Sequence, residues 1–277
     1  MRKVLFPLLA ILLFSACKKE SSPDLLSDEI AGAAANAKKG KIDVCHYDAV
    51  TGTSKTLSLT ENALKSHLAH GDLLGDCSAV LTTICDQDWM VQNLNVDTYR
   101  NGDPIPQVTD PAEWAALTTG AWCYYNNDPE IGANAGKIYN WYAVNDPRGL
   151  APAGWHVPSK TEWDALSTCL GGFSVAGGKM KSTGTWNAGT GYWFEPNTDA
   201  TNSSGFSGGP GGFRYGNGIF DIPDGSFRNI LFTGSWWSST EYTSDRAWDY
   251  RLRWENGQLG RGAGYINDGF SVRCARN

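Results

Sequence analysis

All twelve tryptophans of this 277-residue chain lie between Trp89 and Trp254, and most of its 32 glycines lie in the same region. Clusters such as the one at residues 126–129 cut the region into short extended runs, because asparagine, aspartate, glycine and proline favour turns. The uniform composition indicates one domain from residue 82 to residue 277. We therefore expect a loop-rich α+β domain with few helices.

Two helices are predicted in this domain. The first begins after Asp110, which caps it, and has Pro111 at its first position. The second begins after Ser159, which forms a capping box with Glu162, and ends at Gly171. The side chains expected to face the core are Trp114 and Leu117 in the first helix and Trp163, Leu166 and Leu170 in the second.

Apolar and charged residues alternate in two segments near the C-terminus, which predicts two strands, each with one apolar face. In the first strand Trp248, Tyr250, Leu252 and Trp254 alternate with Asp249, Arg251 and Arg253, and in the second Phe270, Val272 and Cys274 alternate with Ser271 and Arg273. A glycine-rich stretch separates them, so we expect an antiparallel hairpin with a long loop. Trp248 and the other apolar residues of this hairpin are expected to lie in the core.

Residues 41–78 form a separate small module. Alternating residues from Lys55 to Leu59 indicate a strand. Thr60 is a typical N-cap and Gly71 a typical residue after a helix end, so a short helix is expected between them. The stretch resembles a small module of secreted bacterial proteins that carries Cys-His, Ala-His-Leu-x-His-Gly-Asp and Gly-x-Cys motifs.

Three of the chain's four histidines lie in this module: His46, His67 and His70. The last two are three residues apart and so share a helix face. Imidazole is the commonest metal ligand in proteins, so a zinc site completed by Asp72 or a thiolate is one interpretation. A Cys45–Cys77 disulfide is the other, because so small a module is not held together by its core alone. We favour the stapled spacer without a cofactor and keep zinc as the alternative.

Residues 1–17 have the form of a secretory signal peptide, with two basic residues, an apolar run and then Ser15-Ala16-Cys17. The run is about 11 residues long, and about 20 are needed to span a bilayer core of roughly 30 Å. Residues 14–17 resemble a bacterial lipobox, in which Cys17 is acylated; an ordinary signal peptide is the alternative. Residues 18–40 are polar, which predicts a flexible tether.

Without Cys17 the chain has an even number of cysteines, which predicts disulfides in an exported protein but leaves their pairing open. These disulfide candidates are Cys45, Cys77, Cys85, Cys123, Cys169 and Cys274. The net charge of −6 disfavours a nucleic-acid partner, because phosphate binding needs a basic surface.

Seven ordered blocks resemble the Fibrobacter succinogenes major paralogous domain over nearly all of residues 85–277. They are Trp89-Met90-x-x-Asn93-Leu94-Asn95, Tyr99-Arg100-Asn101-Gly102-Asp103, Gly120-Ala121-Trp122-Cys123-Tyr124-Tyr125, Tyr139-Asn140-Trp141-Tyr142-Ala143-Val144, Gly154-Trp155-His156-Val157-Pro158, Trp236-Trp237-Ser238-Ser239-Thr240-Glu241 and Gly269-Phe270-Ser271-Val272-Arg273-Cys274. That family is similar to the C-type lectin-like group, which includes formylglycine-generating enzymes and the variable proteins of diversity-generating retroelements. The resemblance implies a twisted antiparallel sheet with two short helices and long loops.

The resemblance does not extend to catalysis. Formylglycine-generating enzymes use a copper-binding cysteine pair near the C-terminus, where this chain has only Cys274. His156 is the only histidine of the domain, and its apolar neighbours favour a structural role over that of a base. We expect no enzyme activity, although the acidic residues scattered through the loops leave a glycosidase pair open.

Every cation after Lys181 is an arginine, and these arginines are interleaved with aromatic residues and asparagine. Such a composition is typical of contact surfaces, because guanidinium groups bind carboxylates in pairs and stack on rings. The candidate ligand-binding residues, for which an ordinary surface is the alternative, are Asp249, Arg251, Arg253, Glu255, Asn256, Arg261, Tyr265 and Asn267. We expect a lipoprotein of the outer membrane that displays a glycan- or protein-binding domain; a structural or assembly component of the cell surface is the alternative.

Overall fold

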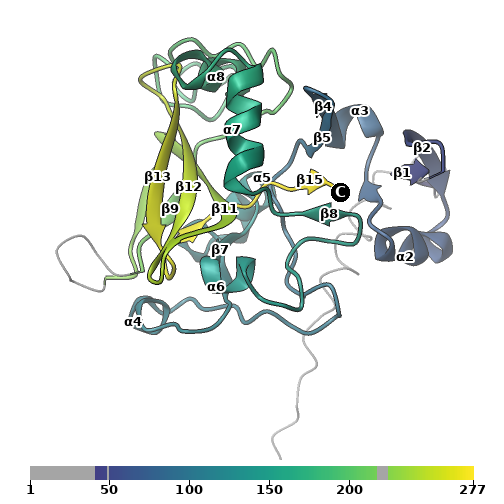
Figure 1. The fold of residues 1–277 in the computed structure, drawn as a ribbon, viewed down its shortest axis with the longest axis horizontal. Coiled ribbons are helices and arrows are strands. Elements are labelled where there is room, and N and C mark those ends of the chain that lie inside the picture. Colours follow the sequence, from purple (N-terminus) through teal and green to yellow (C-terminus); the bar gives the residue numbers. More distant parts are fainter. Residues whose placement is uncertain (1–40, 49, 217–223) are drawn as a thin grey trace, which may run out of the picture.

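A computed structural model describes residues 41–48, 50–216 and 224–277. Figure 1 shows the small module (residues 41–78) beside the larger main domain (residues 82–277). The predicted leader with Cys17 and the tether at 18–40 lie outside the described residues. Within the described part of the chain, no helix has the length and apolar character needed to cross a membrane.

The module is a three-stranded antiparallel sheet covered by a helix. Its elements are β1 (Ile42–Asp48), β2 (Thr53–Leu59), α2 (Glu61–Ala69), β3 (Leu73–Leu74) and α3 (Cys77–Val80). The strand order is β2-β1-β3. Leu64 of α2 is buried against Ile42 and Val44, which form the small core. The helix lies between Thr60 and Gly71 as predicted, although the Thr60 side chain makes no capping hydrogen bond.

The main domain is built on a large mixed sheet. Its strands are β6 (Trp122–Cys123), β7 (Ile138–Asn140), β9 (Gly211–Arg214), β10 (Phe227–Ile230), β11 (Thr233–Thr243), β12 (Arg246–Arg253), β13 (Leu259–Tyr265) and β14 (Gly269–Phe270). Their order is β13-β12-β11-β9-β14-β7-β6, with β10 paired to β9. Only the β9–β11 pair is parallel among these described strands. The long β11, β12 and β13 stand together in Figure 1.

A second sheet joins the beginning, the middle and the end of the main domain. It contains β4 (Leu81–Ile84), β5 (Gln87–Met90), β8 (Trp155–His156) and β15 (Ala275–Arg276). Ala275 pairs with Trp89 on one side and with His156 on the other. The end of the chain therefore ties together segments that are far apart in sequence.

The helices of the main domain are short. They are α4 (Pro111–Ala115), the 3-10 helix η2 (Tyr125–Asn127), α5 (Pro129–Ala135), α6 (Trp141–Val144), α7 (Lys160–Cys169) and α8 (Phe173–Met180). The predicted helices at α4 and α7 are confirmed, with an Asp110 cap and a Ser159–Glu162 capping box. Helix α8 was not predicted because Gly177 and Gly178 weaken a helical pattern. Both glycines are needed for contact, since a Cβ at Gly177 would lie 2.1 Å from the Gln258 carbonyl oxygen.

The core contains most of the tryptophans. One buried cluster lies between α7, α8 and the large sheet and is rich in aromatic side chains. In this cluster Trp163 of α7 stacks on Tyr250 of β12, with ring centroids 4.8 Å apart. Figure 1 shows α7 beside the long strands and α8 at the upper end of β12 and β13.

The predicted C-terminal hairpin is wrong in its second strand. The partner of β12 is β13, so Trp248 pairs with Ala263 and the glycine-rich segment is itself a strand. Phe270 pairs instead with Tyr139 of β7. The glycines of β13 alternate along one face, where a Cβ at Gly264 would lie 2.6 Å from the Phe270 ring. Their spacing therefore reflects close packing on one face of a strand.

Several cations are buried in the described part of the main domain, including Lys181, Arg214 and Arg273. Lys181 donates to the backbone carbonyls of Thr198, Arg253 and Asn256. Arg214 donates to those of Val108, Thr109 and Gly225. Arg273 donates to those of Met90 and Phe206 and also to Asn93 Oδ1. Arg214 and Arg273 lie over the rings of Trp114 and Phe206, respectively. Carbonyl dipoles and ring faces thus take the place that carboxylates occupy in ordinary ion pairs.

Two disulfides are present in the part of the chain that the structure describes. Cys45 is bonded to Cys77 as the module's composition predicts, and Cys85 is bonded to Cys169 of α7. Cys123 and Cys274 are free and buried, so their place among the disulfide candidates was wrong. Cys123 lies on β6 and Cys274 directly before β15, in two different core clusters, which gives neither thiol a partner.

The module docks on the main domain through Gly71. The Trp155 indole Nε1 donates a 2.7 Å hydrogen bond to the Gly71 carbonyl. A Cβ at Gly71 would lie 1.7 Å from the Ala153 carbonyl oxygen, so only glycine fits there. Arg276 stacks between the rings of Tyr47 and Trp155, 4.0 and 4.4 Å from their centroids. These specific contacts therefore fix the position of the module on the main domain.

Candidate functional site

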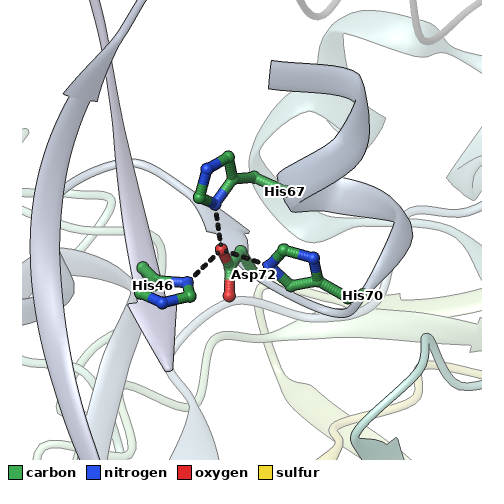
Figure 2. A group of neighbouring side chains, drawn as sticks. All are labelled: His46, His67, His70 and Asp72. Atoms are coloured by element: carbon green, nitrogen blue, oxygen red, sulfur yellow. Dashed lines mark hydrogen bonds and ion pairs between the residues drawn. The ribbon is translucent and has the colours of Figure 1, made fainter. Parts of the chain in front are cut away.

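Four side chains of the module converge on one point, and we call them the histidine cluster: His46, His67, His70 and Asp72 (Figure 2). His46 lies on β1, His67 in the last turn of α2 and His70 at the C-cap of that helix. Asp72 follows Gly71, whose positive φ of 96° turns the chain back toward β1. A strand, a helix end and a turn thus contribute to a single site.

The Oδ2 atom of Asp72 lies among the three rings. It is 2.8 Å from Nδ1 of His46, 2.7 Å from Nδ1 of His67 and 2.9 Å from Nε2 of His70. The four ligand atoms all lie within 4.8 Å of one another. The sequence placed the three histidines near each other, and the structure selects Asp72, not a thiolate, as the fourth group.

Asp72 is the buried member of the cluster. Its side chain is 1% exposed, whereas that of His70 is 50% exposed. Burial favours a higher pKa for this carboxyl, but hydrogen bonds from the imidazoles and from the backbone N–H of Tyr47 outweigh burial and lower the pKa below its ordinary value. Asp72 is therefore anionic at neutral pH.

The cluster is open to solvent on one side. His46 and His70 line a hollow of about 430 Å³ between the module and the main domain. The main domain contributes Ala153, Gly154, Arg276 and Asn277 to its wall. A small ion therefore has a route from solvent to the exposed ring nitrogens.

The predicted ligand-binding residues do not share one surface. Asp249 is fully buried and paired with Arg251, and burial raises the pKa of its carboxyl despite that pair. Asn267 is also buried and donates to the Ala115 carbonyl. Placing these two in a ligand face was wrong, because the glycines of β13 leave room for Asp249 beneath the strand.

The other side of β12 also departs from the expected pattern. Trp248 was expected in the core but is only partly buried. Lys160 and Arg261 lie over its ring at 5.3 and 5.1 Å, and Tyr242 meets its edge. Tyr265 lies elsewhere, with its hydroxyl 2.7 Å from Arg246 Nη2. Strand alternation therefore identified the two sides correctly but not the depth to which each is covered.

Arg253, Glu255 and Asn256 adjoin a surface feature that the sequence did not reveal. Three partly buried rings, which we call the aromatic triad, come from three separate loops: Phe194, Phe232 and Trp254. Their ring centroids are 4.9 to 5.9 Å apart. The residues are separated by tens of positions and meet only through the fold, so no local pattern marks them.

His156 makes hydrogen bonds through both ring nitrogens. Nδ1 is 2.8 Å from Asn277 Oδ1, and Nε2 is 2.5 Å from Glu162 Oε1. Because Glu162 also belongs to the capping box of α7, the ring links the start of that helix to the end of the chain.

Comparison with known families agrees with the seven sequence blocks. The model of the Fibrobacter succinogenes major domain (Fib_succ_major) matches residues 82–276, which run from the second residue of β4 to the end of β15. No curated protein and no solved structure matches the chain. The chain therefore belongs to the Fibrobacter succinogenes major domain family.

Proposed function

We propose that the chain is a lipid-anchored protein of the cell envelope whose main domain binds a glycan at the aromatic triad. The observation that carries this proposal is that three separate loops each bring one ring to the same surface position. Exposed charged residues adjoin these rings in sequence, since Glu195 follows Phe194 and both Arg253 and Glu255 flank Trp254.

The chemistry of this surface suits a sugar. A pyranose has an apolar C–H face that packs on aromatic rings and hydroxyls that bond to carboxylates and guanidinium groups. Arg253 and Glu255 are 54% and 51% exposed and lie 3.7 Å apart, so both are free to pair with a ligand instead. The rings touch one another and leave no cage between them, which disfavours a cationic guest and favours a ligand laid over their outer surface.

The loops that carry the rings are held rigidly. Lys181 donates to carbonyls of Thr198, Arg253 and Asn256, which belong to two of the loops. Backbone bonds from Trp254 N to the Phe232 carbonyl and from Phe194 N to the Leu231 carbonyl connect the third. Rigid presentation lowers the entropy lost on binding.

Binding is tested by titrating the full chain with cellohexaose, xylohexaose and mannohexaose in a calorimeter. We expect at least one to bind with a dissociation constant in the micromolar to millimolar range. Trp254→Ala should weaken that binding by at least about tenfold, and Arg253→Ala should weaken it at unchanged stability.

Tyr242→Ala is the matched control. Tyr242 is an exposed aromatic residue, but its ring lies against Trp248 and does not belong to the triad. This substitution should leave binding unchanged. Equal loss in all three variants, or no saturable binding of any of the oligosaccharides, would argue against the site. Binding of a protein partner alone would favour the alternative ligand class.

The proposal includes a relationship of the main domain to the C-type lectin-like group. It is supported by the twisted sheet, the few short helices and the long loops that resemble the C-type lectin-like group. We assign no catalytic activity to the domain. A structural or assembly role is the alternative, and a filament or ring seen at native concentration would favour it.

The membrane anchor is tested by Cys17→Ser. The variant should move from the membrane fraction to the soluble fraction, because the apolar run before residue 17 is too short to hold the chain once cleaved. Fractionation and immunoblotting of wild type and variant measure this. A variant that stays with the membrane in high salt would contradict lipid anchoring.

A further inference from the structure

Asp72 Oδ2 has more neighbours than a hydrogen-bond acceptor can serve. A carboxylate oxygen offers two lone pairs, yet three ring nitrogens lie within 2.9 Å of it. The other oxygen, Oδ1, already accepts from the Tyr47 N–H at 3.1 Å. Hydrogen bonding alone therefore leaves one ring without a lone pair to use, whereas a cation in the cluster would use a lone pair from every ring.

We propose that the histidine cluster binds one divalent transition-metal ion, with Zn²⁺ as the ion its donors fit best. The ligands are Nδ1 of His46, Nδ1 of His67, Nε2 of His70 and a carboxylate oxygen of Asp72. This site lies in the module and is independent of glycan binding by the main domain.

The geometry is close to that of a tetrahedral site. Zinc bonds to imidazole nitrogen and carboxylate oxygen are about 2.0–2.2 Å long, which separates the ligand atoms by roughly 3.3 Å. The four atoms already lie within 4.8 Å of one another, so small side-chain rotations complete the shell. His46 and His70 face the hollow and are free to make them.

The donor set selects among metals. Three imidazole nitrogens favour zinc and other late first-row ions over calcium and magnesium, which prefer oxygen ligands. The module's two cysteines are bonded to each other, so they leave no thiolate for the ion. The buried anion offsets part of the charge of a divalent ion, and the Tyr47 N–H fixes the orientation of the carboxylate.

The ion would join the separate pieces of the module. It would link β1, the end of α2 and the turn after Gly71, and that glycine is the point at which the module docks on Trp155. Disulfide and metal thus act at different places: Cys45–Cys77 ties β1 to α3, and the metal ties β1 to α2. The stapled spacer and the metal site are therefore compatible.

The test uses the full chain, purified in detergent, stripped with a chelator and titrated with zinc chloride in a calorimeter. We expect one zinc ion per chain and a rise in melting temperature on binding. Asp72→Asn and His67→Ala should each weaken binding by at least about tenfold. Co²⁺ should give the visible absorption of a tetrahedral nitrogen and oxygen site without a thiolate band.

Matched controls are Asp76→Asn, an exposed acid of the same module, and His156→Ala in the main domain; both should bind zinc as wild type does. Circular dichroism in chelator checks the fold of each variant, and His70→Ala, at the most exposed ligand, serves if Asp72→Asn does not fold. No saturable binding, binding unchanged in the ligand variants, or Co²⁺ binding that occurs only after reduction and shows a thiolate band would each overturn the proposal.

Discussion

Lys181→Met is expected to lower the free energy of unfolding by about 3–5 kcal/mol, because each buried carbonyl left without a donor costs about 1–3 kcal/mol. The ammonium group of Lys181 is fully buried and donates to three carbonyls at 2.6, 3.1 and 3.0 Å. Methionine matches the length of the side chain and fills the same space, so the loss reports mainly on these hydrogen bonds. Urea unfolding followed by tryptophan fluorescence measures the difference.

Lys179→Met is the matched control for this substitution. Lys179 lies two residues earlier on α8 and is partly exposed, so its replacement should change stability by no more than about 0.5 kcal/mol. Equal stability of the two variants would show that the carbonyls find other donors and that Lys181 does not hold the loops.

Trp163→Ala is expected to destabilise the main domain by about 3–5 kcal/mol, as other large aromatic truncations in cores do. Trp163 is fully buried, stacks on Tyr250 at 4.8 Å and contacts Trp89 and Phe206. Its removal therefore leaves a large cavity in a cluster of rings that has little freedom to collapse.

Trp248→Ala provides the comparison. This ring is only partly buried, with Lys160 and Arg261 over it, so we expect a loss of about 1–2 kcal/mol. Thermal and urea unfolding of both variants compare the two sites. A larger loss for Trp248 than for Trp163 would contradict the burial described here.

The sequence predicted those parts of the fold that local chemistry determines. Asp110 before a proline and Ser159 three residues before Glu162 mark helix starts, because the signals act within one turn. The glycine pattern of β13 misled the prediction: glycine is common in loops, and nothing local shows that Phe270 packs against Gly264. Helix α8 was missed for the same reason.

The two candidate sites also differ in how far the sequence could predict them. All four residues of the histidine cluster lie within a short stretch of sequence, so the three histidines were found and Asp72 was named as one way to complete the set. Phe194, Phe232 and Trp254 meet only after three loops fold together, and no spacing joins them. Asp249 was predicted to be exposed but is buried, because alternation shows which side of a strand a residue is on and not whether that side is covered.

The buried cations allow the residues of the loops to be substituted without a change in the path of the loop backbone. Lys181 and Arg214 hold loops through main-chain carbonyls, which every amino acid supplies. The side chains of these loops make none of these hydrogen bonds. They can therefore be substituted while the loop backbone keeps its path. A few fixed basic residues would then support many different surfaces, and grafting new residues onto these loops should preserve the frame if loop length is kept.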